Sequence, residues 1–125
     1  VAKVYPQTLV TMADINQRAV ELSRRNAAAN GVHARAVQSD GFAALAGERF
    51  SCVLSNPPIR AGEQVIYGLF QSAAIHLVPG GSLYIVIRKQ QGAPSAIAFL
   101  ETVYDKVQVV EKGSGFWVVR ADTAI

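Results

Sequence analysis

Short apolar runs alternate along the chain with longer segments in which apolar residues recur every three or four positions. The runs predict strands over residues 8–13, 34–38, 50–55, 82–87, 107–111 and 116–120. The longer segments predict helices over residues 16–30, 63–77 and 94–104. Strands that alternate with helices indicate βαβ units, and therefore an α/β fold with a mainly parallel sheet. The last two runs, joined by Gly113-Ser114-Gly115, predict an antiparallel hairpin at the edge of that sheet.

Local signals mark where the helices begin and end. Asn16 is a suitable N-cap for the first helix, and Asn30-Gly31 is a pair that readily turns left-handed at its end. Pro79-Gly80-Gly81 predicts a turn between the second helix and the next strand. The inner face expected for the second helix consists of Val65, Ile66, Leu69, Phe70, Ala73 and Leu77. The stripe expected for the first helix consists of Ala19, Leu22, Asn26 and Ala29.

The strand at residues 50–55 ends abruptly at Asn56-Pro57-Pro58. Its residues are mostly small or apolar, so we expect it to be buried on both faces, with Cys52 as a small core residue. The prolines cannot donate backbone hydrogen bonds, and each disfavours helix for the residue before it. Asn56 therefore follows the strand on a stiff, extended backbone, at the sheet edge where open α/β folds bind ligands. A turn that only ends the strand is the alternative.

Two acidic residues follow other predicted strands in the same way. Asp14 ends the first strand and opens into a helix, where nucleotide-binding α/β folds place the carboxylate that binds ribose hydroxyls. Its alternative role is to help cap the helix that begins near Asn16. Asp40 follows the second strand, within Ser39-Asp40-Gly41-Phe42, where a simple turn residue is the alternative.

Composition sets the broad class of the protein. The chain has 125 residues, of which 50% are hydrophobic and 17% charged, as expected of one small globular domain rather than a disordered segment. Its apolar runs are too short to span a bilayer and no signal sequence is evident, so we expect a cytoplasmic protein. The net charge of +3 comes from scattered basic residues, which permits nucleic-acid binding without requiring it. A single cysteine excludes a disulfide framework.

The order of these motifs resembles one known family. Ser55-Asn56-Pro57-Pro58 is similar to the (Asn/Asp/Ser)-Pro-Pro-aromatic motif of S-adenosylmethionine-dependent methyltransferases that act on planar nitrogen atoms. The likeness continues through residues 77–83, 87–93 and 111–116 and covers nearly all of the chain. With Asp14 and Asp40, this set resembles the class I "methyltransferase small domain" family, whose best-known members methylate the exocyclic N2 of guanine in ribosomal RNA. The resemblance implies a Rossmann-like fold, S-adenosyl-L-methionine as the cofactor, ribosomal RNA or a ribosomal subunit as the partner, and no metal.

The resemblance also assigns roles to individual residues. It implies that the Asn56 side-chain oxygen and the Pro57 carbonyl accept hydrogen bonds from the target amine. The residues implied to bind the cofactor are Asp14, Ile15, Asp40, Gly41, Phe42 and Asn56. The residues implied to contact the substrate are Pro58, Ile59, Arg60, Arg88 and Lys89. For the three basic residues of that set, a solvated surface charge is the alternative.

Two departures from the family pattern affect these expectations. The residue after Pro-Pro is Ile59 instead of the usual aromatic, which reduces the stacking on a target base, worth about 1–3 kcal/mol. The glycine-rich loop that follows the family's first strand, and that lies against the methionine part of the cofactor, has no counterpart in this sequence. We therefore expect residues 1–125 to be the C-terminal part of a single methyltransferase domain that lacks its first, central strand. Unpaired strand edges should result, which either close on one another or are closed by another chain or by a missing N-terminal segment.

The function expected from this pattern is methyl transfer to N2 of guanine in ribosomal RNA. Two other functions stay open. One is methylation of a protein glutamine amide, which the same Asn-Pro-Pro geometry would serve, and the other is non-catalytic RNA binding by a remnant of the fold. The matches around residues 88–93 favour the ribosomal RNA branch.

Overall fold

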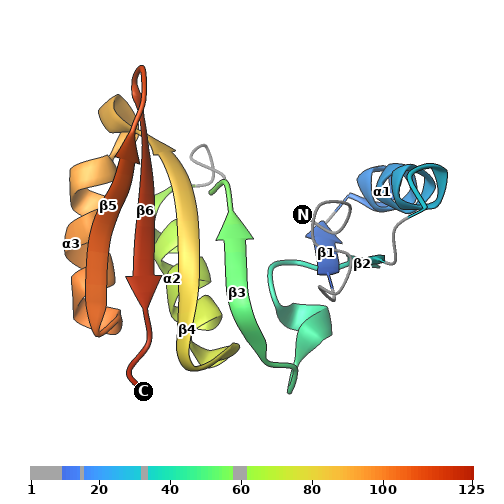
Figure 1. Cartoon of the computed structure of the whole chain (residues 1–125), viewed down its shortest axis with the longest axis horizontal. Coiled ribbons are helices and arrows are strands. Elements are labelled where there is room, and N and C mark those ends of the chain that lie inside the picture. The colour runs from blue at the N-terminus through green and yellow to red at the C-terminus, as the bar shows by residue number, and fades with distance from the viewer. Residues whose placement is uncertain (1–9, 15, 32–33, 58–61) are drawn as a thin grey trace. The chain divides into compact units, whose positions relative to one another are not determined.

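A computed structural model describes residues 10–14, 16–31, 34–57 and 62–125 of the chain. The chain divides into two compact units, Val1–Ala46 and Gly47–Ile125, and each has a sheet of its own (Figure 1). Parallel and antiparallel strand pairs both occur, so the fold is a mixed α/β fold. In the described part of the chain, no helix has the length and apolar character needed to cross a membrane.

The first unit is one βαβ element followed by a short helix. Its elements are β1 (Val10–Asp14), α1 (Gln17–Ala29), β2 (Ala34–Gln38) and the 3-10 helix η1 (Ala43–Leu45). β1 and β2 are parallel neighbours, with Asp14 opposite Gln38 at the carboxyl end of the pair. The Asn16 side-chain oxygen caps α1, as the sequence predicts, by accepting from the backbone N–H groups of Arg18 at 2.9 Å and Ala19 at 3.4 Å.

The predicted stripe of α1 is wrong in its position around the helix. The buried residues of α1 are Val20 and Ala27, which lie seven positions apart and therefore on one face. Leu22, which was expected on the inner face, is 50% exposed.

The second unit is a four-stranded sheet with two helices. Its elements are β3 (Phe50–Ser55), α2 (Glu63–Ile75), β4 (Leu77–Arg88), the 3-10 helix η3 (Lys89–Gln91), α3 (Ala93–Val103), β5 (Lys106–Lys112) and β6 (Phe116–Asp122). The strand order is β3-β4-β6-β5. β3 and β4 are parallel, and the other two pairs are antiparallel, so the predicted hairpin at the sheet edge is confirmed. Figure 1 shows α2 and α3 on the same face of this sheet.

The boundary between α2 and β4 differs from the prediction. The helix was expected to include Leu77 and the strand to begin at Ser82, but Leu77 already belongs to β4 and is buried there. Phe50 pairs with Leu77, whereas Cys52 pairs with Ser82, so β4 has extra residues between these two points. The Pro-Gly-Gly segment fills this irregularity as a bulge within the strand, not as a turn before it.

Among the described elements of the second unit, α2 and α3 cover one face of its sheet (Figure 1). The core side chains between sheet and helices include Phe70, Leu83, Ile85, Leu100 and Val119, all of them fully buried. On the opposite face of the sheet, Leu54, Val86 and Phe116 are exposed. The expectation that the strand before Asn56 is buried on both faces is therefore wrong, and Cys52 is exposed instead of being a core residue.

The outer edges of β1 and β3 have no described hydrogen-bonded neighbour. Among the described strands, β1 pairs only with β2, and β3 pairs only with β4, so each is an end strand of its sheet. These are the two strands between which the sequence predicts an absent central strand.

Tyr104, at the end of α3, forms a hydrogen bond to α2 within the second unit. Its buried hydroxyl donates to the backbone carbonyl of Phe70 at 2.8 Å. Replacing Tyr104 by phenylalanine should lower the free energy of unfolding by about 0.5–1.5 kcal/mol, because the native state loses one buried hydrogen bond. Urea unfolding of both proteins at neutral pH measures the difference, and an unchanged stability would contradict this role of the hydroxyl.

The same residue makes stability depend on alkaline pH. Burial raises the pKa of Tyr104 above its ordinary value of about 10. The native state therefore keeps the phenolic proton more tightly than the unfolded chain does. This contribution to stability is complete below about pH 10 and is lost as the pH rises further. The difference between wild type and Tyr104→Phe should accordingly shrink above about pH 10.

Candidate active site

The two predicted acidic residues lie at one edge of the first unit. Asp14 is the last residue of β1 and pairs with Gln38, the last residue of β2. Asp40 follows Gln38 by two residues, so both acids lie at the carboxyl edge of this parallel pair, where α/β sheets bind ligands. Because Asn16 supplies the side-chain cap of α1, capping is no longer needed to explain Asp14. Ile15 lies outside the described residues.

Ser39 shapes the loop that carries Asp40. Its side chain is buried, and its hydroxyl donates to the Gly41 carbonyl at 2.8 Å and accepts from the Ala44 N–H at 3.0 Å. Gly41 has φ +59°, in the left-handed region that suits glycine. These contacts hold Asp40 exposed, next to a half-buried Phe42. Ser39 was not among the site residues predicted from the sequence, although a serine before Asp-Gly is a recognisable turn signal.

Asn56 and Pro57 lie at the carboxyl edge of the second unit. β3 and β4 are parallel, with Ser55 opposite Ile85, so Asn56 follows directly where β3 ends. Asn56 is exposed and Pro57 is buried, which leaves the amide open to a ligand while its backbone is anchored. The next predicted substrate residues, Pro58, Ile59 and Arg60, lie outside the described residues.

Arg88 and Lys89 lie at the same end of the second sheet. Arg88 is the last residue of β4, and its guanidinium carbon is 5.0 Å from the centroid of the Phe116 ring. The Lys89 backbone N–H donates to the Gly115 carbonyl at 3.0 Å, which joins the end of β4 to the β5–β6 hairpin. Both side chains are exposed. Arg88 therefore stacks on an aromatic ring and still presents its charge to solvent.

Cys52 is not suited to be a nucleophile. Although it is exposed on the open face of the sheet, neighbouring atoms desolvate the thiol and raise its pKa, and the charge of Arg120 offsets only part of this effect. A raised pKa keeps the sulfur protonated at neutral pH, whereas nucleophilic cysteines react as thiolates.

The sequence and the fold were compared with known proteins. The profile of the family described as "Methyltransferase small domain" matches residues 1–120. The Bacillus subtilis protein "Uncharacterized protein YbxB" is 44% identical over 122 residues, which cover 96% of this chain and 61% of that protein. "Ribosomal RNA small subunit methyltransferase C" of Pasteurella multocida is 43% identical over 86 residues, covering 66% of this chain and 26% of that protein.

A solved structure shows the same likeness. The 16S rRNA N2 methyltransferase RsmC of T. thermophilus, in complex with AdoMet and guanosine, superposes with a TM-score of 0.82 at 25% identity, over 93% of this chain and 32% of that one. This chain spans less than two thirds of the length of the two curated relatives described above. It belongs to the methyltransferase small domain family, a class I family of S-adenosylmethionine-dependent methyltransferases.

Proposed function

We propose that the protein is an S-adenosylmethionine-dependent N-methyltransferase that acts on the exocyclic N2 amine of guanine in ribosomal RNA. The observation that carries this proposal is the position of Asn56 and Pro57 directly after β3, at the carboxyl edge of the sheet. A side-chain amide oxygen and a backbone carbonyl there provide two acceptors on a stiff backbone. An exocyclic amine has two N–H donors to match them. The names of the relatives support ribosomal RNA as the substrate.

In this reaction, the residues of the chain itself would bind and orient the amine. If the Asn56 side-chain oxygen and the Pro57 carbonyl each accept one N–H, the lone pair of the nitrogen is left facing the open side of the site. Alignment of this kind accounts for a large part of many enzymatic rate enhancements. S-adenosylmethionine, when bound, supplies a methyl group that its sulfonium already activates. A side-chain nucleophile is then unnecessary, in keeping with the protonated thiol of Cys52.

The edge of the first unit fits the adenosine part of the cofactor. Carboxylates accept hydrogen bonds, and ribose hydroxyls and the adenine amino group donate them. Asp14 would bind the ribose hydroxyls next to Ile15, and Asp40 the adenine amino group, with Gly41 and Phe42 beside the ring. The exposure of Asp40 and the loop that Ser39 holds in place support this assignment.

Arg88 and Lys89 are proposed to hold the RNA backbone. Both are exposed cations at the sheet edge that also carries Asn56, and phosphate contacts of this kind position a nucleic acid without reading its sequence. Pro58, Ile59 and Arg60 follow the target-binding residues and are proposed to contact the base. An RNA substrate in the ribosome would place the protein in the cytoplasm.

We further propose that residues 1–125 form the C-terminal part of one methyltransferase domain. The end strands β1 and β3 would then flank one further strand, supplied by an N-terminal segment or by another chain. The exposed apolar side chains on the open face of the second sheet support additional cover in the complete domain.

The test is methyl transfer from labelled S-adenosylmethionine to unmodified, transcribed small-subunit ribosomal RNA and to isolated small ribosomal subunits. The RNA is digested to nucleosides, and mass spectrometry should identify N2-methylguanosine as the labelled product. Label in a protein glutamine would favour the alternative enzyme class. A protein that binds RNA but transfers no methyl group would show that the activity proposed is wrong.

A further inference from the structure

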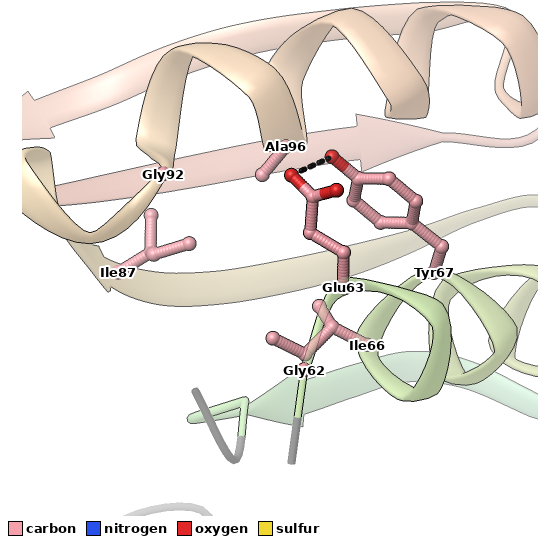
Figure 2. Close-up of a pocket in the computed structure, with 7 residues that line it drawn as sticks. All are labelled: Gly62, Glu63, Ile66, Tyr67, Ile87, Gly92 and Ala96. Carbon is pink, nitrogen blue, oxygen red and sulfur yellow. Dashed lines mark hydrogen bonds between the residues drawn. The ribbon is translucent and has the colours of Figure 1, made fainter. Parts of the chain in front are cut away.

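A cavity of about 280 Å³ opens between the first turns of α2 and α3 in the second unit. Figure 2 shows Glu63 and Tyr67 reaching toward α3 from α2, with Ile87 of β4 on the other side. Ser55 pairs with Ile85, so two residues further along, Pro57 and Ile87 lie level at the carboxyl edge of this parallel pair. The cavity therefore belongs to the edge of the sheet that also carries Asn56.

The size and the walls of the cavity suit one flat ring system. Ile66, Ile87 and Ala96 line it, and all three side chains are buried. A volume of this size is at the lower limit of ligand pockets, which run from about 300 to 1,000 Å³. A single nucleobase matches such a space better than a whole nucleotide or a large cofactor.

The rim of the cavity carries a positioned carboxylate. The Tyr67 hydroxyl donates to Glu63 Oε1 at 3.4 Å, and the Tyr67 ring stacks on Phe99 of α3 with centroids 4.1 Å apart. Desolvation and the charge of Glu63 raise the pKa of Tyr67, so its hydroxyl stays protonated and can donate. Glu63 keeps further lone pairs for a ligand, and as a carboxylate it selects N–H donors.

The starts of α2 and α3 border the same cavity, and in the first turn of α3 Pro94 has no N–H to donate. Gly62 and Gly92 are the N-caps of α2 and α3, with φ +95° and +96°, and neither helix has a side-chain cap at its start. The first N–H groups of a helix have no acceptor within the helix. A side chain added at either glycine would meet no atom of the described residues within 4 Å. These amides can donate to a carbonyl oxygen of a ligand.

We propose that this cavity receives the target guanine, with the Glu63 carboxylate accepting from its N1–H and the first-turn amides of α2 or α3 donating to its O6. This inference rests on the function proposed above and identifies Glu63 as the residue that selects the base. Guanine presents a donor at N1 beside an acceptor at O6, and adenine presents an acceptor at N1 beside a donor at the amino group. A carboxylate opposite N1 therefore accepts guanine and repels the adenine lone pair. In guanine the N2 amine adjoins N1, and Asn56 follows β3 at the same edge of the sheet.

One experiment measures occupancy of the cavity without catalysis. Guanosine 5′-monophosphate is titrated into the methyl-labelled protein, with adenosine 5′-monophosphate as the matched ligand. The guanine nucleotide should shift the methyl resonances of Ile66, Ile87 and Ala96, and the adenine nucleotide should shift them much less. Equal shifts with both nucleotides, or shifts that leave these three residues unaffected, would overturn the inference.

A second experiment links the cavity to the reaction. Glu63→Gln should raise the KM for the RNA by about tenfold or more, with a smaller effect on kcat, because the charged acceptor of N1–H is lost. Glu101→Gln removes the same charge from an exposed position near the end of α3 and should leave both constants unchanged. If wild type methylates guanine while the two variants behave alike, Glu63 does not select the base. If wild type methylates no guanine, the proposed function itself fails.

Discussion

Replacing Asn56 by alanine is expected to lower the turnover of methyl transfer by about a hundredfold or more. The variant loses the side-chain oxygen that would fix the amine, and misplacement of a reacting group by about 1 Å can cost about a hundredfold in rate. Affinity for S-adenosylmethionine should change little, because Asp14 and Asp40, which are proposed to bind the adenosine part, belong to the other unit. Labelled methyl transfer and isothermal titration with the cofactor measure the two quantities.

The control for this variant is Asn26→Ala, which removes the same side chain from an exposed position on α1. It should leave turnover and cofactor affinity near the wild-type values. If Asn56→Ala turns over as fast as the control, Asn56 does not hold the amine. If its turnover and cofactor affinity both collapse together, Asn56 acts through the cofactor instead.

Phe70→Ala is expected to cost about 3–5 kcal/mol of the free energy of unfolding. Phe70 is fully buried between α2, α3 and the sheet, and its ring lies 6.3 Å from that of Tyr67 and 6.5 Å from that of Phe99. Alanine would leave a cavity that these surroundings cannot close. Since natural domains are stable by only about 5–15 kcal/mol, this loss is a large part of the total.

The matched control is Phe116→Ala, which removes the same side chain from the exposed face of the sheet. Phe116 is 41% exposed and contacts Arg88, so its loss should cost much less than that of Phe70. Thermal unfolding compares the two, and the Phe70 variant should melt at least about 12 °C below wild type. Equal losses in the two variants would contradict the position of Phe70 at the centre of the core.

The fold was predicted well from the sequence wherever the structure of a segment depends on a few neighbouring residues. The Asn16 cap is one example, and the strand Ala34–Gln38 and the final hairpin are others. Errors occurred where burial depends on distant parts of the chain. Leu77 continues the helical pattern of α2, yet it pairs with Phe50 as a strand residue. Cys52 is apolar in character, but its exposure depends on which face of the sheet the helices cover.

The candidate site likewise has some features that the sequence predicts and others that it does not. The edge positions of Asp14, Asp40 and Asn56 follow from the rule that parallel strands end together, so the sequence alone predicts them. The cavity beside Glu63 lies between the starts of two helices that are far apart in the sequence, and no local sequence pattern predicts it. Ser39 combines both situations. Its turn signal is local in the sequence, but its hydrogen bond to the Gly41 carbonyl is seen only in the structure.

The position of β6 in the second sheet affects how the protein folds during synthesis. β6 is made after the other described strands of its sheet, yet it lies between β4 and β5, and β5 has no other described neighbour. Until residues 116–122 have left the ribosome, the growing chain therefore presents both β4 and β5 with an unpaired edge. Such edges are prone to pairing with other chains. The second unit should consequently acquire its native sheet in one late step, and a chaperone that shields β4 and β5 during translation should raise its yield.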